Sequence, residues 1–513
     1  MLIQAITITF CAMAIALFRS RSGLALIGDS GSYLAGASGI SQGRLFDTPL
    51  VPSFSELPLV DTVRNSGWSP YADFGIGLPL VIALVHLVLP MNAAAVAVNV
   101  ASIGLIALGF VIGPWSPRRH GELWMRSVIA IAVSCWPIVS FTATGVLSEP
   151  LFCAALLWLA ILLSRLDVGR TVSLVVLGAL TVVIGTLRFV GPIVAIIVAI
   201  LLLQRRVVPR RVAAWTAITV LGPLVATWLA AGNTNTRVLA MHGLDSSDVF
   251  FTARGVGGWF EATLGDQTST LFRSNFDPTI FDWAITIAAV AGAVAVLVRW
   301  ATSIRQRSAP PLEPARVLAV GLALAVVPSM VFIDAVLKLE NRILMPTGLL
   351  VISATGWWIA ERSQSAISPR MNTSRLVSWS FVGLWIIVAT HPWQWLDRPP
   401  AAQSTPLTET VRSLNPSYVV TNRADLVWWT THIPARYLPD GYHDLSDRTF
   451  DTRPIMQSLP CELERTGGVI VIEDGGTIGA VADQLQVDTA NGSYTKSTRP
   501  DGIVVYTPTG LDC

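Results

Sequence analysis

Charged residues are scarce in this sequence: they make up 13% of its 513 residues, against 52% for hydrophobic residues. A soluble globular domain carries about 25% charged residues, so the composition excludes an ordinary soluble domain and indicates a polytopic membrane protein. The formal net charge is only +2, and lysine and arginine form no run outside short loops between apolar segments. This charge distribution excludes a nucleic-acid partner.

Cysteine is also scarce, with five residues, and none has a CxxC or cysteine–histidine spacing of the kind that binds zinc. A structural zinc site is therefore excluded. Cys11, Cys135 and Cys153 lie inside apolar runs, as is typical of small buried side chains. Cys461 and Cys513 stand at the two ends of one polar C-terminal segment, which suggests a disulfide in an oxidising compartment.

Two further features are missing. The first apolar run, Leu2 to Phe18, has no basic stretch before it and no clear cleavage site after it, which favours a retained helix over a signal peptide. The chain also has no visible repeat of about 20–50 residues, which argues against a solenoid.

Long apolar runs are abundant. Crossing the hydrocarbon layer of a membrane takes about 20 apolar residues, and eleven segments qualify. They are 2–18, 92–113, 127–144, 150–166, 171–187, 188–204, 212–231, 281–300, 316–334, 342–360 and 376–391. A twelfth stretch, 73–90, contains Gly75, Gly77 and Pro79, and it either spans the membrane or lies along its surface.

Positive charge predicts the orientation of these segments. Four basic loops, at 116–126, 204–211, 299–316 and 361–375, are expected in the cytoplasm. A single topology, in which successive segments cross the membrane in opposite directions, places all four basic loops in the cytoplasm. It places the long loop 232–280 and everything after residue 391 outside.

The topology ahead of residue 92 has two alternatives. If 73–90 spans, the loop that holds Asp29 is cytoplasmic, which suits Arg19 and Arg21. If 73–90 lies along the outer interface, the N-terminus is inside and Asp29 faces outward. Simple charge counting slightly favours the first alternative.

The C-terminal segment has a different pattern. SYVVTN, GGVIVIE and GIVVYTP are typical of strands, and DLVWWTT and GAVADQLQV of short helices. The predicted architecture is an all-α polytopic membrane bundle of about 11 helices over 1–391, with juxtamembrane helices in its first outer loop (19–91). A small extracytoplasmic α/β domain follows at 392–513.

One acidic residue stands out near the N-terminus. The stretch GDSGSYLAGASGISQG, residues 28–43, places Asp29 and Tyr33 one helical turn apart and continues with small residues, which suits a helix at the membrane surface. An aspartate near a helix end can also be no more than a solvated interfacial carboxylate.

Further motifs follow in order: YADFGIGLPLVIAL, LSEPLFCAALLWLAILL, GTLRFVGP and KLENRILMP. With residues 28–43, this order resembles the GT-C superfamily of integral-membrane glycosyltransferases that use polyprenyl-phosphate sugars, over most of 1–360. The stretch YVVTNRADLVWWTTHIPARYLP looks like the outer domain of actinobacterial and cyanobacterial members.

The resemblance implies roles for individual residues. The aspartate of the first loop is the catalytic base in that family and faces outward, so Asp29 takes this role and the second topology is preferred. With a reference pKa of about 3.9, such a base acts late, as the acceptor hydroxyl attacks the sugar and inverts it.

Cations at outer helix turns are expected to hold the donor phosphate, because a guanidinium grips phosphate oxygens in a bidentate fork. These are Arg188, Lys338 and Arg342, although each is equally explained as an interfacial cation. Tyr33, Glu149 and Glu340 are expected to support the site. Glu340 can pair with neighbouring cations, and Glu149 either orients the acceptor or caps the helix that opens at Pro150.

The expected cofactor and partners follow from the same resemblance. The first loop lacks an Asp-x-Asp pair, and Asp29 with Ser30 and Ser32 is a poor site for a hard cation, so no obligatory metal is predicted, while a divalent ion stays open. The partners are a polyprenyl-phosphate sugar donor, a cell-envelope glycan or glycolipid acceptor and membrane lipids. Arabinofuranose or mannose is the expected sugar, and the cytoplasmic membrane the expected location.

The alternative function is a transporter or flippase of lipid-linked sugar. It predicts inverted repeats and ionisable residues near the membrane midplane. The charges of this chain collect at helix ends instead, which favours the enzyme.

Overall fold

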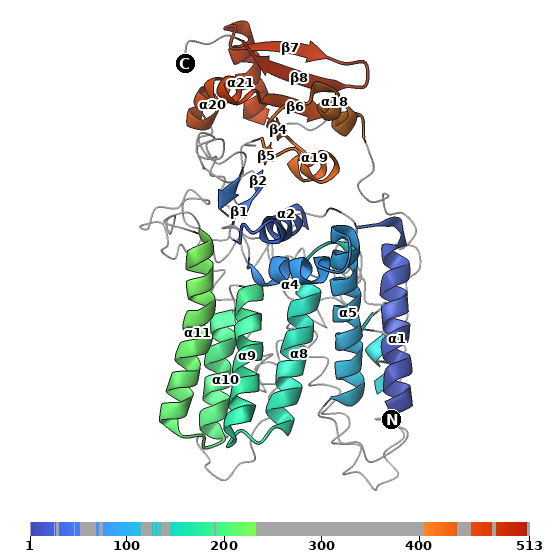
Figure 1. The fold of residues 1–513 in the computed structure, drawn as a ribbon, viewed down its shortest axis with the longest axis vertical. Coiled ribbons are helices and arrows are strands. Elements are labelled where there is room, and N and C mark those ends of the chain that lie inside the picture. The colour runs from blue at the N-terminus through green and yellow to red at the C-terminus, as the bar shows by residue number, and fades with distance from the viewer. Residues whose placement is uncertain are drawn as a thin grey trace, which may run out of the picture.

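The computed structural model describes residues 2–24, 26, 30–45, 47–51, 68–70, 75–113, 126–127, 129–131, 133–134, 144–188, 191–231, 405–438, 453–473 and 479–509. Over these residues the chain forms a bundle of long helices with a sheet domain, here called the tail domain, at one end of it (Figure 1).

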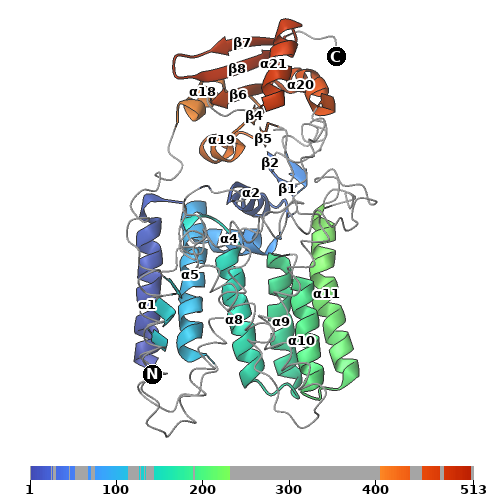
Figure 2. The ribbon, with the colours of Figure 1, turned by 180° about the vertical axis from the view of Figure 1, so that it is seen from behind.

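The bundle helices run side by side in both views (Figures 1 and 2). They are α1 (Leu2–Arg19), α5 (Met91–Ile112), α8 (Glu149–Arg165), α9 (Thr171–Leu187), α10 (Gly191–Gln204) and α11 (Pro209–Ala231). By length and composition, α1 and α5 are able to cross a membrane. These six helices match six of the eleven predicted segments. Segment 127–144 is described only in part, and the four segments after 280 lie outside the described residues, so the number of spans stays a prediction.

Glycines allow the closest approaches between bundle helices. A Cβ at Gly185 of α9 would lie 2.4 Å from Cγ of Pro223 in α11, and one at Gly191 would lie 2.1 Å from the Cα of Gly185. No side chain fits at either distance, so α9 and α10 meet backbone against backbone here, and the ring of Pro223 in α11 packs directly on Gly185. Helix pairs in membranes use small residues in this way because packing, rather than a hydrophobic difference, drives their association.

Arginines cap the helix ends that lie away from the tail domain. Arg165 donates to the carbonyl oxygens of Ile112 and Gly113 at the end of α5, and Arg205 donates to Leu163 O in the last turn of α8. The last carbonyls of a helix have no partner within it. Arg205 belongs to the basic loop 204–211 that is predicted to lie in the cytoplasm, so this residue also completes a helix at that end.

Two short helices lie across the bundle at the end nearer the tail domain: α2 (Ser30–Ser41) and α4 (Gly77–His86) (Figures 1 and 2). With 10 residues, α4 is shorter than the roughly 20 that a span needs. A Cβ at Gly75 would lie 2.4 Å from Thr186 O at the end of α9. Of the two alternatives for 73–90, the described residues from 75 on agree with a helix that lies along the end of the bundle and not with a span, while the outward position of this end stays a prediction.

The tail domain is built on a six-stranded sheet of order β2-β5-β4-β6-β8-β7. Its strands are β2 (Leu50–Val51), β4 (Val419–Thr421), β5 (Ala435–Tyr437), β6 (Val469–Glu473), β7 (Tyr494–Thr498) and β8 (Ile503–Pro508). The first four run parallel, and β8 and β7 follow antiparallel. The helices are α18 (Pro406–Leu414), α19 (Ala424–Thr431), α20 (Arg453–Thr466) and α21 (Gly479–Ala490).

The predicted α/β character of the C-terminal segment is confirmed, since β4, β6, β8, α19 and α21 all lie where the sequence patterns put them. Three strands of the sheet were not predicted: β5 and β7 of the C-terminal segment, and β2, which comes from the first loop. In the same loop β1 (Asp47–Thr48) pairs with β3 (Ser69–Pro70), and η1 (Ser20–Ser22) follows α1. The predicted domain boundary at 391/392 lies outside the described residues.

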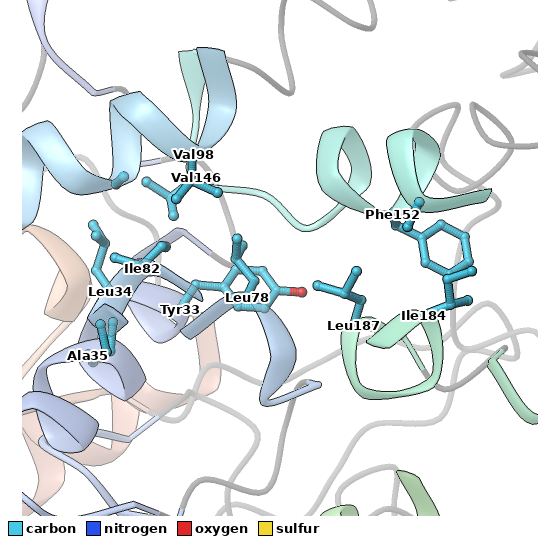
Figure 3. Packing of buried hydrophobic residues seen from close by; sticks show 14 of the residues in the cluster. Tyr33, Leu34, Ala35, Leu78, Ile82, Val98, Val146, Phe152, Ile184 and Leu187 are labelled. Carbon is cyan, nitrogen blue, oxygen red and sulfur yellow. The ribbon is translucent and has the colours of Figure 1, made fainter. Parts of the chain in front are cut away.

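A single hydrophobic core runs from the bundle into the tail domain. It includes Phe152 of α8, Leu34 of α2, Leu50 of β2 and Val427 of α19. Figure 3 shows its central part, where Tyr33 and Leu78 lie together and Phe152 packs beside Ile184. This core fixes α2 between the bundle and the tail domain.

Candidate functional site

The candidate site is centred on residues 145–149, the GVLSE segment, which leads into α8. Ser148 and Glu149 are both completely buried. Four neighbours hold the segment in place. Asn99 of α5 donates to the carbonyl of Gly145, the Val146 N–H donates to Ser30 Oγ at 3.0 Å, and Tyr33 and Arg188 contact Ser148. The segment therefore joins α2, α5 and the end of α9.

Ser148 is hydrogen-bonded both to Tyr33, a residue of the first loop, and to the cation Arg188. The Tyr33 hydroxyl donates to Ser148 Oγ at 3.0 Å, and Nε of Arg188 donates to the same oxygen at 3.1 Å. A serine hydroxyl has two acceptor lone pairs, so one oxygen serves both donors. Tyr33 itself is buried in the core shown in Figure 3. The two side chains are thereby fixed relative to each other.

Arg188 also forms an ion pair with Glu149, through Nη2 and Oε1. Arg188 follows the last residue of α9 in an extended conformation, where a cation complements the negative end of the helix. Glu149 is the first residue of α8, where an acid complements the positive end. The side chain of Arg188 keeps 19% of its surface exposed while that of Glu149 has none, so Arg188 is partly accessible and its partner carboxylate is fully buried.

Three of the predicted site residues, Tyr33, Glu149 and Arg188, are brought together here. Asp29 directly precedes α2 in the chain but lies outside the described residues, as do Lys338, Glu340 and Arg342. Their roles stay predictions.

The cysteine and metal predictions are also left open. Cys461 is disulfide-bonded, but Cys513 lies outside the described residues, so their pairing stays a prediction. Within the described part of the chain, no three His, Cys, Asp or Glu side chains gather into a possible metal site.

Sequence reasoning missed Ser148, Ser30 and Asn99. Asn99 carried a usable signal, because an amide inside the apolar run 92–113 is costly unless it is hydrogen-bonded. The hydroxyl of Ser148 carried none, since a serine before a glutamate and a proline is usual at any helix start.

No protein-family model matches this sequence, and no curated protein matches it either. Solved structures do match. ArnT from Cupriavidus metallidurans, bound to undecaprenyl phosphate, aligns with a TM-score of 0.50 and 11% identity, over 98% of this chain and 97% of its own. The oligosaccharyltransferase AglB from Archaeoglobus fulgidus, in complex with an inhibitory peptide and a dolichol-phosphate, aligns with a TM-score of 0.51 and 11% identity, over 99% of this chain and 74% of its own.

These likenesses concern the fold. The chain shares its fold with these polytopic membrane proteins. More narrowly, the fold is that of the GT-C glycosyltransferases, the class to which ArnT and AglB belong. The predicted GT-C fold is confirmed, whereas the actinobacterial subtype stays a prediction.

Proposed function

We propose that this protein is a GT-C glycosyltransferase of the cytoplasmic membrane that takes its sugar from a polyprenyl-phosphate carrier. The observation that carries the proposal is the position of Arg188. It stands at the bundle end nearer the tail domain, held by Ser148 and Glu149, in a fold shared over 98% of the chain with ArnT bound to undecaprenyl phosphate.

Arg188 holds the phosphate of the donor. A guanidinium offers five N–H groups in a planar fork that matches phosphate oxygens. Its bonds to Ser148 and Glu149 fix the plane of this fork, so little side-chain freedom is lost when phosphate binds. Lys338 and Arg342 are the further phosphate-binding cations of the proposal, with Glu340 beside them.

Asp29 is the catalytic base. It removes the proton of the acceptor hydroxyl while the acceptor oxygen bonds to C1 of the sugar. The bond between C1 and the phosphate oxygen breaks at the same time, and the polyprenyl phosphate leaves with the electron pair. Attack from the side opposite the phosphate inverts C1. Stabilising the departing phosphate is the main task of the cations.

The acceptor is a hydroxyl of a cell-envelope glycan or glycolipid on the outer face of the membrane, and the sugar is arabinofuranose or mannose. The capping arginines support this orientation, because an excess of arginine marks the cytoplasmic side. The site lies at the other end. No obligatory metal takes part.

The test is the transfer of radiolabelled sugar from defined polyprenyl-phosphate donors by purified protein. We expect Asp29→Asn to abolish transfer. Asparagine is as good a residue as aspartate before a helix, so this change keeps any capping role. Wild-type transfer by Asp29→Asn would remove Asp29 as the base.

Arg188→Gln is expected to weaken donor binding. Its matched control is Arg170→Gln, because Arg170 is a largely exposed arginine whose side chain pairs with Asp167 at the other end of the bundle. Equal effects of the two changes would contradict the role of Arg188. Movement of labelled donor across vesicles without sugar transfer would instead indicate a flippase.

A further inference from the structure

The first-loop helix α2 has contacts on two sides. Through Ser30 and Tyr33 it is bonded to the GVLSE segment. It also meets helix α19 and strand β2 of the tail domain, as both ribbon views show (Figures 1 and 2). The tail domain thus reaches the same short helix that follows Asp29.

The contact with α19 is unusually close. A Cβ at Gly31 would lie 2.7 Å from Cβ of Asp425 and 3.1 Å from Cδ2 of Leu50, and only glycine fits at such distances. Asp425 is 5% exposed and Leu50 is 1% exposed. The first turn of α2 therefore rests directly on Cβ and the backbone of Asp425 in the first turn of α19.

The strand contact fixes the direction of the first loop. Leu50 and Val51 pair in parallel with Ala435 and Arg436 of β5, and the Ala435 N–H donates to Pro49 O at 3.3 Å. This pairing covers an edge of the tail sheet that would otherwise expose unpaired backbone groups. The first loop and the tail domain are thus one packed unit.

Asp425 is buried where it meets Gly31, and its charge acts on Tyr437 of β5. Burial together with the negative charge of Asp425 raises the pKa of Tyr437 well above its usual range. The phenol of Tyr437 therefore stays protonated and uncharged beside Asp425 at neutral pH.

We propose that the tail domain is a positioning element of the transfer reaction, with Asp425 as its main positioning residue. Asp425 packs against Gly31, and strand β5 pairs with β2. Through these two contacts the tail domain holds α2 against the GVLSE segment while sugar is transferred. It thereby fixes the start of α2, which follows Asp29, relative to Arg188. This proposal rests on the proposed function.

A cross-link between the two parts tests whether they stay together. In the full-length double variant Leu50→Cys/Ala435→Cys, the new cysteines stand at paired strand positions. We expect oxidation to link them, and the linked protein to transfer sugar within about twofold of the same sample after reduction. Wild-type protein and the two single variants are oxidised and reduced in the same way as controls, because the reductant can also break the disulfide of Cys461. Activity that is lost on linking and restored by reductant would overturn the proposal.

A variant with a larger side chain at position 31 tests whether the close contact between Gly31 and Asp425 matters for sugar transfer. Gly31→Ala should lower kcat by about tenfold or more, since small misplacements of reacting groups are costly. The donor KM should change by no more than about twofold, because Arg188 is untouched. Adding Asp425→Gly, which removes the atom nearest to the new methyl group, should restore part of kcat. A wild-type kcat for Gly31→Ala, or no recovery in the double variant, would overturn the proposal.

The two proposals fail differently. If wild-type protein transfers sugar from no donor, the proposed function is wrong, but backbone hydrogen exchange of residues 30–45 still reports the contact. Faster exchange in Gly31→Ala than in wild type is expected. Unchanged exchange there would show that the tail domain does not hold α2.

Discussion

Arg188 forms an ion pair with Glu149, and the carboxylate of this pair is completely buried. Removing one partner of such a pair leaves a buried charge without its counter-ion, which costs about 3–5 kcal/mol. We therefore predict that Arg188→Met strongly lowers the thermal unfolding temperature of the protein in detergent. The double variant Arg188→Met/Glu149→Gln should recover much of the loss. Equal stability of the single and the double variant would contradict this account.

Ser148→Ala removes the acceptor shared by Tyr33 and Arg188. We expect a loss of about 1–3 kcal/mol in the free energy of unfolding and a higher donor KM, because the guanidinium loses one of its anchors. Ser164→Ala is the matched control, since Ser164 is on the same helix and its hydroxyl bonds to the carbonyl of Ile161 within that helix. The measurement is the donor KM of each variant, obtained from the rate of transfer at increasing donor concentration. A similar KM in both variants would refute the role of Ser148.

Gly185→Ala and Gly222→Ala should act in opposite directions. At Gly185 the new methyl group would meet Pro223 at 2.4 Å, whereas at Gly222 the nearest atom, Cγ2 of Val182, is 3.9 Å away. Overpacking costs about 1–3 kcal/mol, so Gly185→Ala should unfold at lower temperature. Gly222→Ala gains about 1 kcal/mol of helix propensity and should unfold at the same or a higher temperature.

The tail domain should lose stability at alkaline pH. Burial raises the pKa of Tyr418 and Tyr494, and burial together with the charge of Asp425 raises that of Tyr437. The unfolded chain loses these protons near pH 10 while the folded domain keeps them, so the folded state binds more protons there. This contribution is complete below about pH 10 and declines as pH rises above it.

The measurement is tyrosinate absorbance together with thermal unfolding in detergent between neutral and alkaline pH. Tyr418→Phe should reduce the alkaline loss, because the variant has no phenol to ionise at this buried position. Titration of all tyrosines near pH 10 in the folded protein would contradict the prediction.

The long apolar runs predicted their helices well, because in a membrane a single apolar segment satisfies its backbone hydrogen bonds by forming a helix. The stretch 73–90 was ambiguous because it is apolar over most of its length. Its glycines decided the outcome: Gly75 and Gly77 let the backbone press against Thr186 and Leu187 at the end of α9, which a spanning helix would not require.

Local signals for some missed elements were present in the sequence. The helix α18 begins with Thr405 and Pro406, and the hydroxyls of Thr405 and Thr408 cap its first turn reciprocally. Threonine followed by proline is a typical helix start.

Other features had no local signal. Nothing around Leu50 shows that its partner is Ala435, because strand pairing depends on how distant segments fold. For the same reason the sequence placed Arg188 and Glu149 at one end of the bundle but gave no indication that Ser148 joins Arg188 to Tyr33.

The pairing of β2 with β5 also sets an order for biosynthesis. Leu50 leaves the ribosome long before Ala435, and at about 5–20 residues per second the delay between them is on the order of tens of seconds. During that time the rest of the bundle is made and inserted while the first loop waits without its strand partner. Docking of the tail domain on β2 and α2 is therefore among the last steps of maturation, so an unfinished chain lacks this contact.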